Sequence, residues 1–322
     1  QVSLWAREDG VSALRYLFLL RGPAVVSETF AVAALVDGQA VEALVPLAQQ
    51  RRPFLPVATL RRLMINAAVS IYRQQRGGGP AATAGSSTAA RLLFEAGAYE
   101  ELATLLLELL AEALLASPAA NATLTPGLHP AAAAPSSTEA EAAVAQWRAD
   151  ARSFLETWHL ADEPAAASNG QPLRAMLEIA ELLYAMATWR QQAAAAGGEP
   201  ALNTALGMLD ALRLLPAHPS TVDAAHAEFR LLPHALQRLA PPLLYAAMQA
   251  THLKFIRLKR AQPAGGLVGG AEELRALRER GEALIGFTAV TCFGTGTSMG
   301  APLMMMPHAA SQQLATWLAE MS

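Results

Sequence analysis

The sequence predicts an all-α protein, an irregular α-solenoid of stacked antiparallel helix pairs joined by low-complexity loops. Apolar residues make up 53% of the 322 residues and aromatic residues only 6%, because alanine, the strongest helix former, supplies much of the apolar content. Leucines and other apolar residues recur at spacings of three and four, which places them on single helical faces. Only LIGFTAVTCF, residues 284–293, could also be interpreted as a β-strand.

Charge and cysteine content exclude several classes of protein. The formal net charge of −3 argues against general affinity for nucleic acid or acidic membranes. The single cysteine, Cys292, allows no intrachain disulfide and no multi-cysteine metal site, and indicates a reducing compartment. The uncharged run 283–319 is interrupted by GTGTSMGAP, so its apolar stretch is shorter than the roughly 20 residues needed to span a bilayer.

Glycines and prolines divide the first third of the chain into helices. Three related turns begin at Asp9, Asp37 and Ala96, and each has a glycine that closes one helix before the next begins, as in stacked helical pairs. Their irregular spacing favours an irregular solenoid over a strict repeat array. The predicted helices of this part cover 11–20, 25–36, 41–49 and 57–75, followed by a low-complexity loop at 77–88.

The middle of the chain is expected to hold three further helices. The first carries a broad leucine stripe that must be buried between neighbouring helices. A helix over 138–160 and another over 172–192 repeat the pattern, and low-complexity loops at 117–137 and 161–171 separate the three. The leucines of the stripe are Leu102, Leu105, Leu106, Leu109, Leu110 and Leu114.

Two long helices are expected after a proline-rich turn in the last third. Pro216 and Pro219 end a helix, and Ser220 or Thr221 offers an N-cap for the next. Pro241 and Pro242 predict a kink or break, after which Leu244, Met248, Thr251, Phe255 and Leu258 share one face. Lysines and arginines at 254–260 complement the helix dipole. A loop at 261–270 precedes a second helix, which Glu272 opens.

This last third resembles a known family. The order of an LRLLP turn at 212–216, a helix ending in KFIRLKR, a glycine-rich loop and a helix LRALRERGEALIGFTA is similar to the C-terminal end of the nucleoporin-interacting component family. Members of that family are inner-ring α-solenoid scaffolds of the nuclear pore, and one of them is the vertebrate ninety-three-kilodalton nucleoporin. The resemblance covers 202–293 closely, and the earlier chain shares its helical character.

The resemblance implies a structural, non-enzymatic nucleoporin at the nuclear envelope that supports pore assembly and nucleocytoplasmic transport. Residues 1–322 would be the C-terminal part of one solenoid domain. In the family, a region N-terminal to the solenoid holds the coiled-coil trimer of the central channel and the large solenoid nucleoporins. The solenoid itself receives a linear segment of a membrane-associated inner-ring nucleoporin. Direct nucleic-acid binding, a transmembrane segment and a cofactor are not implied, and the partner-binding residues remain open.

Two alternatives stay open. A helical-repeat adaptor of a cytosolic complex would share the fold and differ only in its partners. A serine hydrolase is suggested by Gly296-Thr297-Ser298-Met299-Gly300, because a G-x-S-x-G turn presents a nucleophilic serine in α/β-hydrolases. Such an enzyme needs alternating strands and helices upstream, which the pattern of the chain does not predict.

No residue set predicts a metal or catalytic centre. The seven histidines lack the carboxylate spacing of metal sites, and we expect them at helix surfaces and ends. Cys292 is expected to be a small buried residue. The tryptophans Trp147, Trp158, Trp189 and Trp317 are expected to pack within the core, with a partner groove as the alternative. The histidines are His129, His159, His218, His226, His234, His252 and His308.

Overall fold

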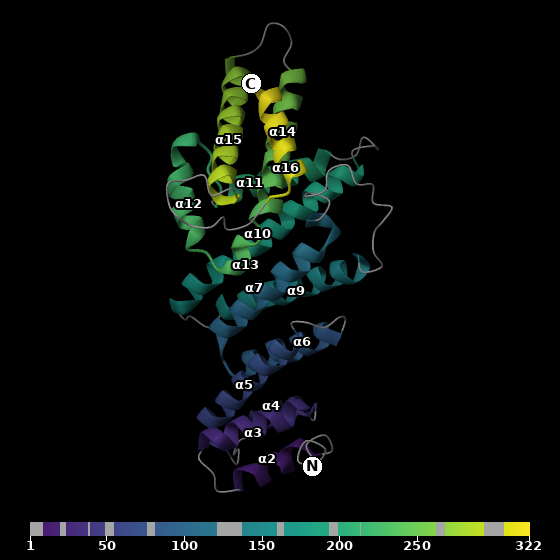
Figure 1. Cartoon of the computed structure of the whole chain (residues 1–322), viewed down its shortest axis with the longest axis vertical. Coiled ribbons are helices and arrows are strands. Elements are labelled where there is room, and N and C mark those ends of the chain that lie inside the picture. Colours follow the sequence, from purple (N-terminus) through teal and green to yellow (C-terminus); the bar gives the residue numbers. More distant parts are fainter. Residues whose placement is uncertain are drawn as a thin grey trace. The chain divides into compact units, whose positions relative to one another are not determined.

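A computed structural model gives the arrangement of the chain (Figure 1). It describes residues 9–19, 24–37, 39–48, 55–75, 81–120, 137–159, 164–192, 199–212, 214–261, 268–292 and 306–322. Every regular element within these ranges is a helix, which confirms the predicted all-α fold. The chain divides into two compact units, Gln1–Leu106 and Leu107–Ser322, and each is described by itself.

Unit 1 is a series of helices in which each element packs against a near neighbour in the sequence. α5 covers the range predicted from its apolar stripe, and α3, α4 and α6 pack against it. The core of the unit includes Leu14, Leu44, Leu63 and Leu92, all less than 2% exposed. The helices are α2 (Gly10–Leu19), α3 (Ala24–Asp37), η1 (Val41–Ala43), α4 (Leu44–Ala48), α5 (Val57–Gln75) and α6 (Ala81–Glu95).

Two of the predicted turns show the expected chemistry. The Asp9 carboxylate accepts a hydrogen bond from the Ser12 amide at 3.0 Å and so caps α2. Gly97 has φ +64°, and the Ala98 amide donates to the Leu93 carbonyl at 2.9 Å, which closes α6. At the third turn Gly38 lies outside the described residues, and the left-handed conformation is taken by Gln39, with φ 53°.

Unit 2 contains the end of α7 (Tyr99–Ala116) and all later helices. Arg148 and Arg152 of α9 both pair with Glu181 of α10, which fixes these two helices side by side. The three leucines of the α7 stripe that belong to this unit, Leu109, Leu110 and Leu114, are buried, and so are the three that belong to unit 1. The further helices are α9 (Ser137–His159), α10 (Pro164–Gln192), α11 (Glu199–Ala211), η4 (Pro219–Thr221), α12 (Val222–Arg230), α13 (His234–Gln237), α14 (Ala240–Ala261), α15 (Val268–Cys292) and α16 (His308–Met321).

The predicted loops are too wide. Residues 81–88, 164–171 and 268–270 form the first turns of α6, α10 and α15, and Ser137 opens α9. Residues 117–120 also belong to the packed structure, since Ser117 is fully buried and its hydroxyl donates to the Leu114 carbonyl at 2.7 Å. Alanine-rich sequence resembles a loop in composition but forms helix readily once a neighbour such as α5 buries it. The remaining parts of these loops, at 77–80, 121–136, 161–163 and 262–267, lie outside the described residues.

Candidate interaction surface around helix α15

Helix α15 is the central element of the C-terminal part of unit 2. It packs against α14, α16, α12 and η4 (Figure 1). Leu277, Gly281, Leu284, Thr288 and Thr291 recur at intervals of three and four and are buried. The opposite side of α15 is charged, as expected for an amphipathic helix at a protein surface.

The break predicted at the two prolines is the start of α14. Pro241 and Pro242 occupy its first turn. The backbone amides of a first turn have no acceptor within the helix, so proline costs no intrahelical hydrogen bond there. Before them, the Gln237 side chain donates to the carbonyls of Arg230 (3.0 Å) and Leu232 (2.8 Å), which satisfies the end of α12. The face beginning at Leu244 is buried through Phe255, as predicted.

An aromatic contact joins α12 to α15. The rings of Phe229 and Phe287 meet edge to face, with centroids 5.6 Å apart, and both side chains are buried. His226 lies one turn before Phe229 and contacts the same Phe287 ring at 6.3 Å. Burial lowers the pKa of His226 from its ordinary value of 6.5, Arg230 lowers it further, and Asp223 opposes both. His226 is therefore a packing residue at a helix contact.

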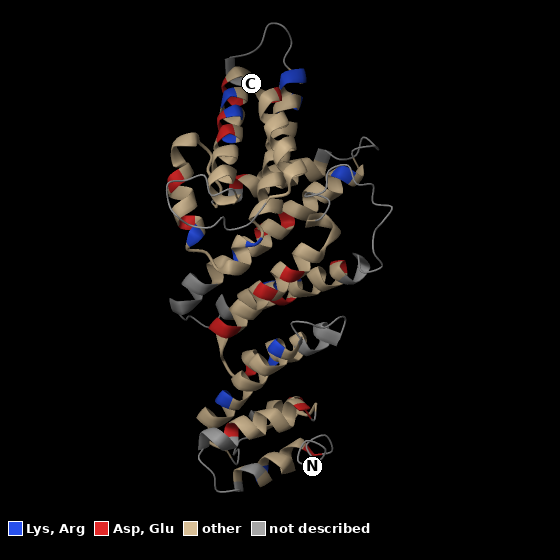
Figure 2. Ribbon diagram, in the orientation of Figure 1, with Lys and Arg blue, Asp and Glu red and all other residues tan. Residues whose placement is uncertain are grey.

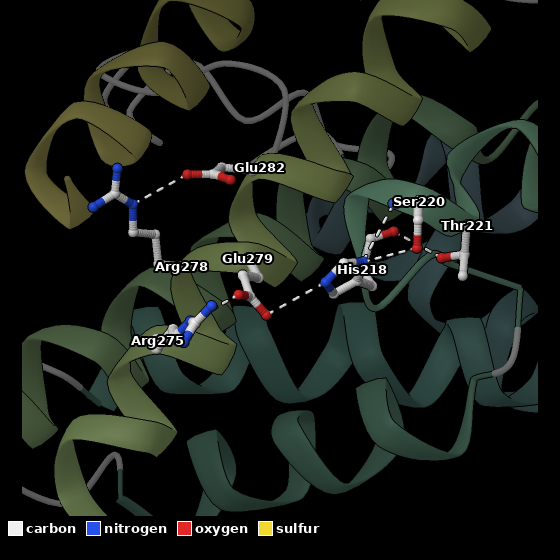
Figure 3. Close-up of polar contacts among 7 residues, drawn as sticks. All are labelled: His218, Ser220, Thr221, Arg275, Arg278, Glu279 and Glu282. Atoms are coloured by element: carbon white, nitrogen blue, oxygen red, sulfur yellow. Dashed lines mark hydrogen bonds and ion pairs between the residues drawn. The ribbon is translucent and has the colours of Figure 1, made fainter.

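The turn before α12 is capped by a histidine. The Nδ1 atom of His218 accepts from the Ser220 amide at 3.3 Å, and the Thr221 hydroxyl donates to the His218 carbonyl at 2.8 Å. Thr221 is the N-cap residue of α12, as predicted, but its side chain makes no capping hydrogen bond to the first turn of that helix. The other ring nitrogen, Nε2, lies 3.5 Å from the Glu279 carboxylate, so one imidazole joins η4 to α15 (Figure 3).

The charged side of α15 is largely neutralised by its own neighbours. Arg275 pairs with Glu279 and Arg278 with Glu282, each at 3.1 Å and four residues apart (Figure 3). Two further pairs reach other helices, Lys254–Glu273 at 2.9 Å and Arg280–Asp210 at 2.5 Å. Figure 2 shows acidic and basic residues alternating along α15. This mixture of signs differs from the single-sign stripe of a phosphate-binding surface.

The comparison with protein families decides the identity. The family model described as Nup93/Nic96 matches residues 80–293, about two thirds of the chain. This chain belongs to the Nup93/Nic96 family. The match includes the segment 202–293, where the sequence resemblance is closest, and extends towards the N-terminus as far as residue 80. No curated protein gives a match to the chain.

Membership in the Nup93/Nic96 family assigns the chain a structural nucleoporin role and the nuclear pore as its location. Together with the all-helical fold, it favours a non-enzymatic protein. Within the described residues, 284–292 form the end of α15 instead of the strand that a hydrolase would need before its nucleophile. Ser298 itself lies outside the described residues.

In this Nup93/Nic96 chain, the histidines and the cysteine that could bind a metal or act in catalysis do not come together in the described residues. In the described ranges, no three His, Cys, Asp or Glu side chains are close enough to hold a metal ion. Cys292 is 1% exposed and burial raises the pKa of its thiol to about 12, which confirms it as a buried residue. His234 and His308 are exposed at the starts of α13 and α16, and His252 is buried on α14. His129 and the side chain of His159 lie outside the described residues.

The tryptophans of the Nup93/Nic96 chain are mainly packing residues. Trp147 on α9 and Trp317 on α16 are buried, as predicted, whereas Trp189 on α10 is half-buried. The side chain of Trp158 lies outside the described residues. In the part of the chain that the structure describes, no helix combines the length and the apolar character that crossing a bilayer requires.

Proposed function

We propose that this protein is a scaffold of the inner ring of the nuclear pore at the nuclear envelope, where it supports pore assembly and nucleocytoplasmic transport. The Nup93/Nic96 match over residues 80–293 supports the proposal. Members of the family that the sequence resembles are inner-ring solenoid scaffolds. The same match also favours the role of a pore scaffold over that of an adaptor in a cytosolic complex. In this proposal, residues 1–322 form the C-terminal part of one solenoid domain.

The proposed partners are other nucleoporins. A region N-terminal to the solenoid would hold the coiled-coil trimer of the channel and the large solenoid nucleoporins. The solenoid described here would receive a linear segment of a membrane-associated inner-ring nucleoporin. Such a segment would insert apolar side chains between helices, the usual way in which helical grooves recognise peptides.

The surface chemistry supports contact with protein and argues against direct contact with nucleic acid. The arginines of α15 lie within 3.1 Å of carboxylates on the same or a neighbouring helix. Phosphate binding would have to break these pairs before any gain from the phosphate charge. Lys259 at the end of α14 lies 5.5 Å from the Phe255 ring, so part of its charge is also engaged.

Affinity capture tests the proposed role. The tagged full-length protein is recovered from gently lysed cells after cross-linking, and its partners are identified by mass spectrometry. We expect inner-ring and channel nucleoporins, with cross-links to Lys254 or Lys259. Recovery of a different assembly, with nucleoporins at background, would overturn the proposal.

A core variant provides the matched control. Leu284 is 1% exposed at the centre of α15, so Leu284→Asp buries an unpaired charge and disrupts the α14–α16 region. Partners that are lost from Leu284→Asp depend on the folded solenoid. Partners recovered equally from both proteins bind elsewhere or adhere non-specifically.

A further inference from the structure

His218 lies in the turn between α11 and α12, and its imidazole makes a different contact through each ring nitrogen. The Nδ1 atom accepts a hydrogen bond from the Ser220 amide at 3.3 Å and lies 2.9 Å from the Ser220 hydroxyl oxygen. The Nε2 atom lies 3.5 Å from a carboxylate oxygen of Glu279 on α15 (Figure 3). Both atoms of the ring that can carry a proton therefore face a defined partner.

The contact of Nδ1 with the backbone requires a neutral ring. A ring nitrogen accepts a hydrogen bond from an amide through its lone pair, so it cannot carry a proton at the same time. The hydrogen bonds of the turn therefore assign the ring proton of neutral His218 to Nε2, which faces Glu279. Protonation of Nδ1 takes the acceptor away from the Ser220 amide. The new N–H group finds the Ser220 hydroxyl oxygen 2.9 Å away as its own acceptor.

The contact of Nε2 with Glu279 gains strength from the charge of the ring. Glu279 divides its two carboxylate oxygens between two partners, because Arg275 donates from Nε to Oε1 at 3.1 Å and Oε2 faces His218. A separation of 3.5 Å is long for a hydrogen bond between nitrogen and oxygen, which usually spans about 2.7–3.2 Å. A neutral imidazole therefore gains little from Glu279, whereas a positively charged one forms an ion pair with it at the same distance.

Protons from the solvent reach both ends of this contact. The side chain of His218 is 54% exposed and that of Glu279 is 31% exposed. The ring can thus gain or lose its proton without any opening of the fold. The charge on the imidazole is set by the pH of the surrounding solution.

The other charged groups of the helices packed against η4 leave Glu279 as the partner of the imidazole. η4 packs against α15 and α12. On α15, Arg278 pairs with Glu282, and Arg280 pairs with Asp210 of α11. Among the described residues, only Glu279 forms an ion pair with His218. The charged or titratable residues of α12 are Asp223, His226, Glu228 and Arg230.

We propose that His218 is a proton-operated switch in the turn before α12. While neutral, the imidazole caps the turn through the Ser220 amide and holds Glu279 only weakly. Once protonated, it releases that amide, donates to the Ser220 hydroxyl oxygen and forms an ion pair with Glu279. Protonation exchanges a contact within the turn for a contact with α15, so the turn is held more tightly to α15 as the pH falls. The proposal does not depend on the scaffold role.

A double-mutant cycle at two pH values measures the ion pair. Asparagine is a preferred capping residue, so His218→Asn keeps an acceptor for the Ser220 amide at every pH, and Glu279→Gln removes the carboxylate charge. An unperturbed histidine changes charge between about pH 5 and 8, a range in which an unperturbed glutamate is largely ionised. We expect the two substitutions to be additive at about pH 8. At about pH 5.5 their coupling should change the equilibrium constant of unfolding by about two- to fivefold, as for other exposed ion pairs.

The pair Arg278–Glu282 provides the matched control on the same helix. Its two groups lie 3.1 Å apart, and both are of types that stay charged over this pH range. A cycle of Arg278→Gln and Glu282→Gln should therefore give the same coupling at both pH values. Circular dichroism establishes at each pH that every variant is folded. A coupling between His218 and Glu279 that is equal at the two pH values, or larger at about pH 8, would overturn the proposal.

The backbone amide of Ser220 tests the other half of the switch in the full chain. Nuclear magnetic resonance of protein labelled with nitrogen-15 serine follows this amide from about pH 8 to 5.5, and the signal missing from Ser220→Ala assigns it. We expect the amide proton signal to move upfield as the pH falls, because the amide loses its acceptor. The signal should stay in place in His218→Asn. A signal that does not move in the wild type, or that moves equally far in His218→Asn, would contradict the release of the amide and leave the scaffold role untouched.

Discussion

His252 on α14 and Glu320 on α16 are 68 residues apart in the sequence and meet at 2.6 Å, Nε2 to Oε2. Because the imidazole is mostly buried and the carboxylate half-exposed, we expect the pair to contribute about 1 kcal/mol to the free energy of unfolding. A double-mutant cycle with His252→Ala and Glu320→Ala in urea measures this coupling. The exposed pair Arg275–Glu279 is the control and should couple by about 0.3 kcal/mol. Equal coupling in the two cycles would contradict a role of the His252 pair in holding α16.

The Phe229–Phe287 contact should dominate the docking of α12. Phe287 is fully buried, so Phe287→Ala should lower the free energy of unfolding by about 3–5 kcal/mol, through lost burial and the cavity left behind. Denaturation followed by circular dichroism measures the change. Leu231, at the end of α12, is 86% exposed, and Leu231→Ala should stay within about 0.5 kcal/mol of the wild type. A small effect of Phe287→Ala would mean that α12 packs on α15 less tightly than the structure indicates.

Helix positions followed from the sequence wherever an apolar stripe had clear limits. α5 covers the predicted 57–75 because its stripe begins after Pro56 and ends before the glycines at 77–79. The first turns of α6 and α10 were missed, since alanine, serine and glycine resemble loop composition and only a packing partner decides their state. Local pattern therefore predicts the existence of helices better than their starts.

The contacts around α15 were only partly predictable. Pairs such as Arg275–Glu279 follow from the helical spacing of four. Arg280–Asp210 and His252–Glu320 join residues about seventy positions apart, and no spacing rule reveals them. His218 was not expected as a cap, because histidine is not among the usual capping residues. The family resemblance, in contrast, needed only the order of helical motifs.

Two glycines provide a matched test of backbone conformation. Gly97 has φ +64°, which a residue with a side chain adopts only at a cost, so Gly97→Ala should lower the free energy of unfolding by about 1 kcal/mol. Gly207 is an exposed residue within α11, and a Cβ there would meet no atom within 4 Å. Gly207→Ala should therefore raise the free energy of unfolding by about 0.5–1 kcal/mol. Thermal and urea denaturation of both variants measure the two changes. Shifts in the same direction would contradict the left-handed conformation of Gly97 or the helical conformation of Gly207.

The pKa of His226 predicts a loss of stability in mild acid. Burial lowers this pKa below 6.5 in the folded state. At pH values between the folded pKa and 6.5, the unfolded chain therefore binds more protons at His226 than the folded chain does. The stabilising contribution is fully present above pH 6.5 and is lost as the pH falls through the folded pKa. Urea denaturation at several values between about pH 7.5 and 5.5 gives the free energy of unfolding as a function of pH. This free energy should fall less steeply with decreasing pH for His226→Gln than for the wild type. Leu231→Ala, which changes an exposed residue without a titratable group at the end of α12, is the control and should keep the wild-type slope.

The buried thiol of Cys292 should report the integrity of α15. The side chain is 1% exposed and burial raises its pKa to about 12, so the reactive thiolate is scarce and inaccessible in the folded protein. We expect iodoacetamide to leave Cys292 unmodified under native conditions at neutral pH and to modify it completely in urea, as mass spectrometry will show. Phe287→Ala, which loosens the packing of α15 five residues before Cys292, should increase the native rate of modification, whereas Leu231→Ala should not. Rapid native modification of the wild type would mean that the end of α15 opens frequently, which its buried environment argues against.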